Sequence, residues 1–279
     1  MVRVMSDLRY LSWNDSESFG SSFGMLNKAE ELTSDGHHYY YKLSRMQGSA
    51  IVGFESVFEY IASRYLDVLG IPHVVYDILP ANIHIREKDI FALVCRSEDY
   101  KLPEDEAVPI EEFCPERDLA ESTISKTFGA QALFQIYLVD FLINNVDRHG
   151  HNLEVVLSNG RETIAPLFDH GSCLLHWAPN EDSVRRYDVL TDTHTNNYVG
   201  DESLFTNLHK ITNPVLVNPL TPRARSYIFY NLKNQYLPQG IKDKTWEMIC
   251  VRYNYAKNNN FLIERSTPPT ETSSHFNSC

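Results

Sequence analysis

The stretch 145–169, NVDRHGHNLEVVLSNGRETIAPLFD, decides how this chain is interpreted. Two short apolar runs rich in β-branched or aromatic residues flank Asn159-Gly160, and an Asn-Gly pair between such runs is the strongest short-range sign of a β-hairpin. If the two runs pair antiparallel, Asp169 returns close to Asn152, where the hairpin began. The sequence therefore predicts that oxygen-bearing side chains from the two ends of the hairpin meet at one place.

This predicted meeting point suits a particular kind of chemistry. Oxygen ligands that converge near a loop are the ligands that a hard cation such as Mg²⁺ prefers, so we expect Asn152 and Asp169 to be metal ligands. Asp147 lies on the same loop, where its carboxylate could orient a nucleophile. This arrangement is typical of a phosphoryl-transfer site.

The same residues carry a family resemblance. Asp147-x-x-x-x-Asn152, a hairpin and then Phe168-Asp169-x-Gly171 resembles the catalytic loop and metal-binding motif of the protein-kinase-like superfamily. The order Asp147-Arg148-His149 is similar to that of phosphatidylinositol 3/4-kinases rather than to the His-Arg-Asp order of ordinary protein kinases. The phrases LVDFLINNVDRHGHNLEVV and APLFDHGSCLL most resemble bacterial HipA-like kinases, including CtkA-type serine/threonine kinases, and the match extends more weakly over residues 20–175.

The resemblance implies a two-lobed α+β fold. We expect a mostly β N-lobe over residues 1–97, a mostly helical C-lobe over 98–265, and a disordered tail over 266–279, which lacks apolar spacing. It also implies ATP and Mg²⁺ as cofactors and transfer of the γ-phosphoryl group to a Ser/Thr hydroxyl of a protein, with autophosphorylation. The activity expected from the resemblance is therefore that of a serine/threonine kinase.

A glycine-containing loop near the N-terminus is a candidate phosphate site. It contains Gly20, Ser21, Ser22 and Gly24, and glycines let backbone N–H groups approach phosphate oxygens closely. By its spacing alone such a loop is more often a flexible turn, so the resemblance carries this assignment. A serine of this loop is autophosphorylated in HipA, and both Ser21 and Ser22 are in the matching region.

The next two elements supply the other nucleotide residues that the resemblance implies. The run 38–43, HYYYKL, has strand composition and places Lys42 on a strand, where kinases keep the lysine that holds the α- and β-phosphates. The run 53–69 has apolar residues at helical spacing, and Gly70 ends it. Glu55 and Glu59 lie one turn apart on this helix, and either can pair with Lys42. Counting back from the Leu-Gly helix end favours Glu59.

Two residues of the catalytic loop are candidates for the proton acceptor. Asp147 matches the aspartate that accepts or orients the acceptor hydroxyl in kinases, whereas His149 is the side-chain type suited to proton transfer at neutral pH. His149 could equally be a loop-bracing residue. Arg148 is expected to brace the loop against a carboxylate.

Composition limits the partners. A formal charge of -12 without long like-charge blocks argues against direct nucleic-acid binding and against an anionic membrane surface. The five scattered cysteines and the lack of an apolar span or leader favour a cytoplasmic protein, with export to a host cell left open. The expected partners are a protein substrate and a small regulatory or antitoxin-like protein. The stretch before Lys42 is shorter than the N-terminal subdomain through which HipA contacts its antitoxin, which argues against a toxin–antitoxin role.

Other functions compete with the kinase hypothesis. Four histidines near the carboxylates, His149, His151, His170 and His176, suggest a metallohydrolase, although none has a familiar zinc spacing. A lipid or small-molecule kinase of the same fold, and a non-catalytic module that binds nucleotide or a partner, are the remaining alternatives.

Five further segments have predictions that the structure can test. Residues 96–127 are polar, acidic and proline-containing, which favours a surface insertion, and 180–204 favours a long loop where a kinase keeps its activation or substrate segment. Apolar periodicity predicts helices over 128–144, 222–237 and 242–263.

Overall fold

A five-stranded sheet forms the N-terminal part of the protein, in the order β1-β6-β7-β3-β2. The computed structural model describes residues 5–14 and 26–266, so Gly20, Ser21, Ser22 and Gly24 lie outside the described residues, as does nearly all of the predicted tail. The strands of this sheet are β1 (Ser6–Asp7), β2 (Lys28–Leu32), β3 (His38–Lys42), β6 (Tyr76–Ile85) and β7 (Lys88–Glu98). β1 runs parallel to β6, and the other neighbours are antiparallel.

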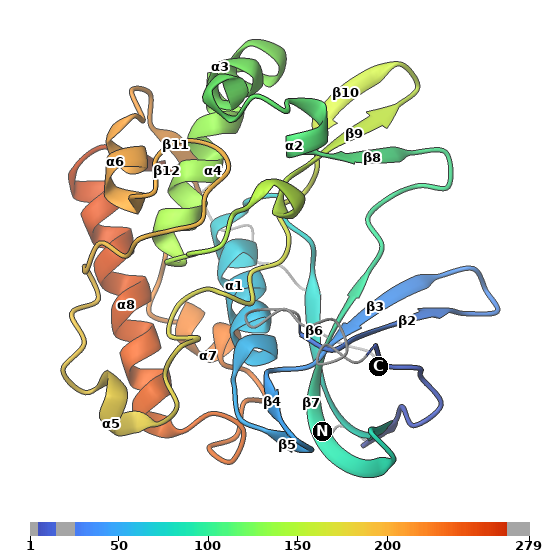
Figure 1. Cartoon of the computed structure of the whole chain (residues 1–279). Coiled ribbons are helices and arrows are strands. Elements are labelled where there is room, and N and C mark those ends of the chain that lie inside the picture. The colour runs from blue at the N-terminus through green and yellow to red at the C-terminus, as the bar shows by residue number, and fades with distance from the viewer. Residues whose placement is uncertain (1–4, 15–25, 267–279) are drawn as a thin grey trace, which may run out of the picture.

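Helix α1 (Glu55–Leu69) lies between this sheet and the C-terminal helices (Figure 1). Its apolar residues recur at helical spacing, and Gly70 ends it with a φ of 66°, a left-handed conformation that glycine adopts without a steric cost. A small hairpin, β4 (Met46–Gln47) and β5 (Ala50–Ile51), precedes the helix. Side chains of α1 share one hydrophobic core with β6 and with the C-terminal helices, so α1 joins the two parts.

The C-terminal part is mainly helical. Its two longest helices are α4 (Ala130–Leu142), which is buried almost all round as its sequence predicts, and α8 (Gln239–Asn258). The shorter helices are α2 (Ile110–Phe113), α3 (Arg117–Phe128), the 3-10 helix η2 (Gly150–Asn152), α5 (Glu181–Val184), α6 (Leu204–His209) and α7 (Ala224–Ile228). Strands β8 (Glu106–Pro109), β9 (Glu154–Ser158) and β10 (Arg161–Ile164) form one small sheet, and β11 (Val215–Val217) pairs with β12 (Leu262–Glu264). The α+β class with a sheet-rich N-terminal part and a helical C-terminal part is therefore confirmed.

The hairpin at the centre of the sequence forms as predicted. β9 and β10 pair antiparallel, with Arg161 opposite Ser158. Both turn residues have positive φ, 50° at Asn159 and 74° at Gly160, which is the requirement of the tight turn that matches strand twist. The local Asn-Gly signal therefore determined both the turn and the register.

Three predictions about the C-terminal half need correction. Residues 96–127 are not a surface insertion, because Ile110, Ala120 and Ile124 are completely buried. The segment 222–237 contains only the short helix α7, and the last predicted helix ends at Asn258, before β12. The polar segment 96–127 forms several short packed elements instead of a loop. The apolar residues of 222–237 and 242–263 are likewise divided between shorter elements and do not form one helix each.

No helix within 5–14 and 26–266 combines the length and the apolar character that crossing a membrane requires.

Candidate active site

A buried arginine ties together the two ends of the hairpin. The Arg148 side chain is 1% exposed and pairs with Asp140 of α4, with Nη2 2.9 Å from Oδ1. Its Nη1 donates to the carbonyl oxygens of Asn152 at 2.9 Å and Phe168 at 2.7 Å. Since Phe168 immediately precedes Asp169, this one guanidinium holds the backbones of Asn152 and of the segment that leads to Asp169 side by side. The expectation that Arg148 braces the loop against a carboxylate is met by Asp140.

Lys42, Glu59 and Asp169 converge from three separate elements. Lys42 Nζ lies 2.8 Å from Oε1 of Glu59 on α1 and 3.1 Å from Oδ1 of Asp169, which follows β10. Lys28 Nζ, from β2, lies 3.9 Å from the second oxygen of Asp169. Glu59 is therefore the glutamate that faces Lys42. Glu55 instead accepts a hydrogen bond from the backbone N–H of Arg45 at 3.0 Å.

The charges of this cluster stabilise one another. Burial alone would lower the pKa of Lys42, but the carboxylates of Asp169 and Glu59 raise it well above its ordinary value. Burial likewise opposes ionisation of Asp169, yet Lys42 and Lys28 hold its pKa well below the usual range. Burial raises the pKa of Glu59, against the attraction of Lys42. The site thus keeps the Lys42 ammonium group and an ionised Asp169 carboxylate in contact, with both side chains largely shielded from water.

The backbone of Asp169 adopts an uncommon conformation. Its φ is 53°, in the left-handed region that non-glycine residues rarely adopt. Its N–H donates to the hydroxyl of Tyr76 at 3.2 Å, and the ring of that buried tyrosine lies 5.6 Å from Lys42 Nζ. Tyr76 is a site residue that the sequence analysis missed, because nothing distinguishes it among 16 tyrosines.

A loop from the C-terminal part runs beside the catalytic loop. The N–H of Asn196 donates to the carbonyl of Val146 at 2.8 Å, and that of Tyr198 donates to Arg148 at 2.9 Å. Asn196 Nδ2 also donates to Oδ1 of Asp147 at 3.1 Å, which fixes the orientation of that carboxylate. The segment predicted as a long loop over 180–204 therefore contacts the site directly, and Asn196 is a second residue that the sequence analysis missed.

The two candidate proton acceptors are neighbours. His149 Nε2 lies 4.0 Å from Oδ2 of Asp147, and both side chains are partly exposed. His149 Nδ1 accepts the backbone N–H of His151 at 3.2 Å, so the ring also caps the short η2 helix. His149 thus makes the bracing contact while its second nitrogen faces Asp147. Both side chains therefore stay partly open to solvent on the same loop.

The donor set around Asp169 fits Mg²⁺ bound together with phosphate oxygens. Asn152 donates through Nδ2 to the carbonyl of Asp147 at 2.8 Å, which holds the amide nitrogen against that loop and leaves Oδ1 as the atom that could bind a metal. No group of three His, Cys, Asp or Glu side chains that could hold a metal occurs among the described residues. One carboxylate with one amide oxygen is a sparse set, and Mg²⁺ commonly uses one or two carboxylates plus substrate phosphates. Asn152 and Asp169 would hold such an ion, which neutralises phosphate charge.

The four histidines do not form a hydrolytic metal site. His151 Nδ1 lies 2.7 Å from Oε1 of Glu111 on α2, away from the lysine cluster. His170 is completely buried; burial and the nearby Arg148 lower its pKa well below the ordinary value, and its Nδ1 lies 3.3 Å from Arg148 Nη2. Its backbone N–H donates to Glu59 at 3.2 Å. The buried Nε2 of His170 and Nδ1 of His176 have no hydrogen-bond partner among the described residues. The four histidines do not gather with carboxylates into a metal-holding group in this part of the chain, so the arrangement does not favour the metallohydrolase alternative.

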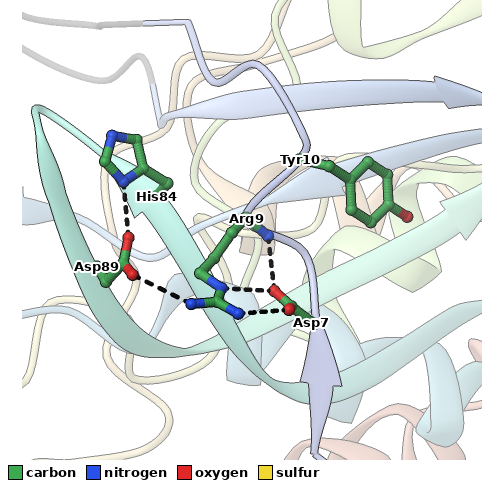
Figure 2. A pocket seen from close by; sticks show the side chains of 5 residues that line it. All are labelled: Asp7, Arg9, Tyr10, His84 and Asp89. Carbon is green, nitrogen blue, oxygen red and sulfur yellow. Dashed lines mark hydrogen bonds and ion pairs between the residues drawn. The ribbon is translucent and has the colours of Figure 1, made fainter.

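A hollow of about 480 Å³ in the N-terminal sheet is lined by ionisable residues away from the lysine cluster (Figure 2). Its Arg9 donates to both oxygens of Asp7 and lies 3.3 Å from Asp89, whose other oxygen binds His84 at 2.7 Å. The hydrogen bonds from Arg9 lower the pKa of Asp7 to about 2. Because the arginine and both carboxylates already satisfy one another at the surface, this cluster has little left to bind a ligand.

Comparisons with known proteins bear on the fold. No protein-family model matches the sequence, and no curated protein matches it either. The chain is similar in structure to the proinflammatory kinase CtkA of Helicobacter pylori, with a TM-score of 0.57, 16% identity, and coverage of 92% of this chain and 99% of that one.

Two further solved structures are more distant. HipA of Shewanella oneidensis MR-1, in a complex with HipB and operator DNA, gives a TM-score of 0.41 and 13% identity over 90% of this chain and 60% of that one. The Golgi casein kinase with Mn/ADP bound gives 0.45 and 13%, over 92% and 73%. CtkA is aligned almost end to end, at a TM-score that indicates a shared fold. The chain therefore has the kinase fold of CtkA.

Proposed function

We propose that this protein is an ATP- and Mg²⁺-dependent kinase that transfers the γ-phosphoryl group to a Ser/Thr hydroxyl of a protein and phosphorylates itself. The observation that carries the proposal is the contact of Lys42 with both Glu59 and Asp169. A strand lysine paired with a helix glutamate, next to the metal aspartate, is the arrangement that phosphoryl transfer in kinases requires.

Each side chain of the cluster has a role in this reaction. Lys42 neutralises phosphate oxygens, and Glu59 holds its ammonium group in position from the buried side. Asn152 and Asp169 bind the divalent cation. Because the transition state of phosphoryl transfer is stabilised mainly by positioning and charge, these fixed charges can lower the barrier without covalent chemistry.

The acceptor hydroxyl is placed by the catalytic loop. Asp147, oriented by Asn196, accepts the hydrogen of the hydroxyl as its oxygen forms the new bond to the γ-phosphorus and the bond from that phosphorus to the ADP oxygen breaks. His149, 4.0 Å from Asp147, can receive the proton in turn. Ser21 and Ser22 are the proposed sites of autophosphorylation.

Transfer of labelled phosphate tests the proposal. The full chain is incubated with γ-labelled ATP and Mg²⁺, alone and with a basic protein, casein or phosphatidylinositol vesicles as acceptors. We expect labelling of the chain itself and of a protein acceptor. Asp169→Asn should reduce the rate by at least about 100-fold, because it removes a charge that acts at the developing transition state. Asp243→Asn, on α8 far from the cluster, is the matched control and should retain full activity.

The outcomes separate the alternatives. Label on the vesicle lipid rather than on protein would contradict the protein acceptor and favour the lipid kinase. Binding of ATP·Mg²⁺ by calorimetry with no transfer to any acceptor would favour the non-catalytic nucleotide-binding module. If the chain binds no ATP at all, the kinase function is wrong. Where the chain does become labelled, mass spectrometry of its peptides identifies the modified residue as Ser21, Ser22 or another serine.

A further inference from the structure

A second lysine faces the metal aspartate. Lys28 on β2 lies directly opposite Lys42 on β3 in the antiparallel register. Side chains of opposed residues in such a pair project from the same face of the sheet with Cβ atoms about 5 Å apart. Both lysines therefore point toward Asp169, Lys42 to Oδ1 at 3.1 Å and Lys28 to Oδ2 at 3.9 Å.

The two lysines have different surroundings. Lys42 is 10% exposed and held between two carboxylates, Glu59 and Asp169, whereas Lys28 is 48% exposed and reaches only Asp169, at a longer distance. An ammonium group has three N–H donors, so Lys28 retains unused hydrogen-bonding capacity at the mouth of the site. A divalent cation bound to Asp169 would repel the positive charge of Lys28. Lys28 would then be more stable if it moved from Asp169 to an anion such as a phosphate group.

The backbone of Lys28 is held in place by two hydrogen bonds, while its side chain is 48% exposed. Its N–H donates to Oδ1 of Asn14 at 2.5 Å, and the N–H of Asn14 donates back to its carbonyl at 3.0 Å. These bonds attach the start of β2 to segment 5–14. The lysine is thus presented at a constant place, and only its flexible stem has to swing from Asp169 to a ligand.

We propose that Lys28 is a second phosphate-binding residue, which leaves Asp169 when a nucleoside triphosphate binds and then holds oxygens of its terminal phosphates. This inference rests on the proposed kinase function and adds a residue to the site. The ligand class is a nucleoside triphosphate with its divalent cation. Nucleosides, which lack phosphates, do not gain from Lys28.

Calorimetry on the full chain tests this role, with ATP·Mg²⁺ and adenosine as the two probes. Lys28→Ala should weaken binding of ATP·Mg²⁺ by about 10- to 100-fold, the usual loss of one charge-assisted hydrogen bond. Its affinity for adenosine should stay unchanged. Lys28→Arg, which keeps the charge, should recover most of the ATP affinity. Lys88→Ala, on the exposed β6–β7 turn side of the same sheet, is the control and should bind both probes like the wild type.

Several results would overturn the inference. Equal ATP·Mg²⁺ affinity in Lys28→Ala and the wild type would show that Lys28 does not bind phosphate. Tighter binding in Lys28→Ala would make Lys28 a competitor of the cation at Asp169. A parallel loss of adenosine and ATP affinity would indicate a merely structural role. If the wild type binds ATP·Mg²⁺ and Asp169→Asn does not, the proposed kinase function stands even when the Lys28 inference fails. If the wild type binds no ATP, both proposals are wrong.

Discussion

Arg148 shows how much of the site depends on a single side chain. It is buried with Asp140, and it supports two carbonyl groups on either side of the hairpin. A buried ion pair is costly to form because both charges lose their hydration. Removing one partner destabilises the fold, because the other charge stays buried without compensation. The brace therefore holds the loop that ends at Asn152 at a set distance from the segment that leads to Asp169.

Replacing this arginine tests the brace. Arg148→Met should lower the free energy of unfolding by about 3–5 kcal/mol, because Asp140 then stays buried without a cation. Urea denaturation measures the change, and the double variant Arg148→Met/Asp140→Asn should recover part of it. The control is Arg185→Met, whose exposed pair with Asp182 has an N–O distance of 2.7 Å and should contribute less than about 1 kcal/mol. Equal losses at the two sites would contradict the buried brace.

At the scale of secondary-structure elements, Glu121 connects three helices. It lies on α3, accepts a hydrogen bond from Tyr137 on α4, and pairs with Lys210 just after α6 at 2.9 Å. Burial raises the pKa of Glu121, but the hydrogen bonds from Tyr137 and Lys210 outweigh it and lower the pKa below its ordinary value of 4.5. This connection belongs to the segment that the sequence suggested was only a surface insertion.

The depressed pKa predicts the direction of a pH effect. A carboxyl whose folded pKa is lowered stabilises the fold above its unfolded pKa, and this stabilisation is lost as the pH falls through the folded pKa. Glu121→Gln should therefore be less stable than the wild type at pH 7 by about 1 kcal/mol or less, and the difference should shrink below pH 4.5. Urea denaturation across pH measures it, with the exposed Glu162→Gln as control. A difference that grows toward acid would contradict the assignment.

Across the whole molecule, the helix that carries Glu59 is attached to the C-terminal part on its far side. Arg64 of α1 donates to the carbonyl of Tyr227 at 2.7 Å, and its guanidinium lies 3.5 Å from the centre of the Tyr227 ring. The Tyr227 hydroxyl donates to Asp67 at 2.9 Å, and Tyr60 donates to the carbonyl of Tyr230 at 3.0 Å. The position of Glu59 against Lys42 is thus supported by α7 and the loop after it.

Loosening this attachment should make α1 more mobile. Arg64→Ala removes a cation–π contact and a hydrogen bond, together about 1–2 kcal/mol, so the amides of α1 should exchange with deuterium on the order of tenfold faster. Lys101→Ala is a matched control, since Lys101 lies 5.7 Å from the Tyr100 ring but outside α1. Hydrogen–deuterium exchange measured by mass spectrometry compares the two variants. Unchanged exchange in α1 of Arg64→Ala would show that α7 does not hold the helix.

Features encoded by neighbouring residues could be predicted from the sequence alone. The Asn159-Gly160 turn, the strand that ends at Lys42 and the helix that ends before Gly70 all form as expected, since local φ/ψ preference and apolar periodicity determine them. The resemblance of the 145–169 stretch also indicated the kinase fold. What the catalytic, metal and nucleotide residues do remains a prediction.

Contacts between distant segments required the tertiary structure. The family resemblance favoured Glu59 over Glu55 as the partner of Lys42, and the packing of α1 against the sheet places Glu59 there while Glu55 binds the backbone of Arg45. Lys28, Tyr76 and Asn196 reach the site from three other elements with no spacing that could reveal them. Periodicity shows which face of an element is buried but not what it is buried against. The sequence by itself therefore determined the central hairpin, the strand that ends at Lys42 and helix α1, whereas the tertiary structure decided which charges meet at Asp169.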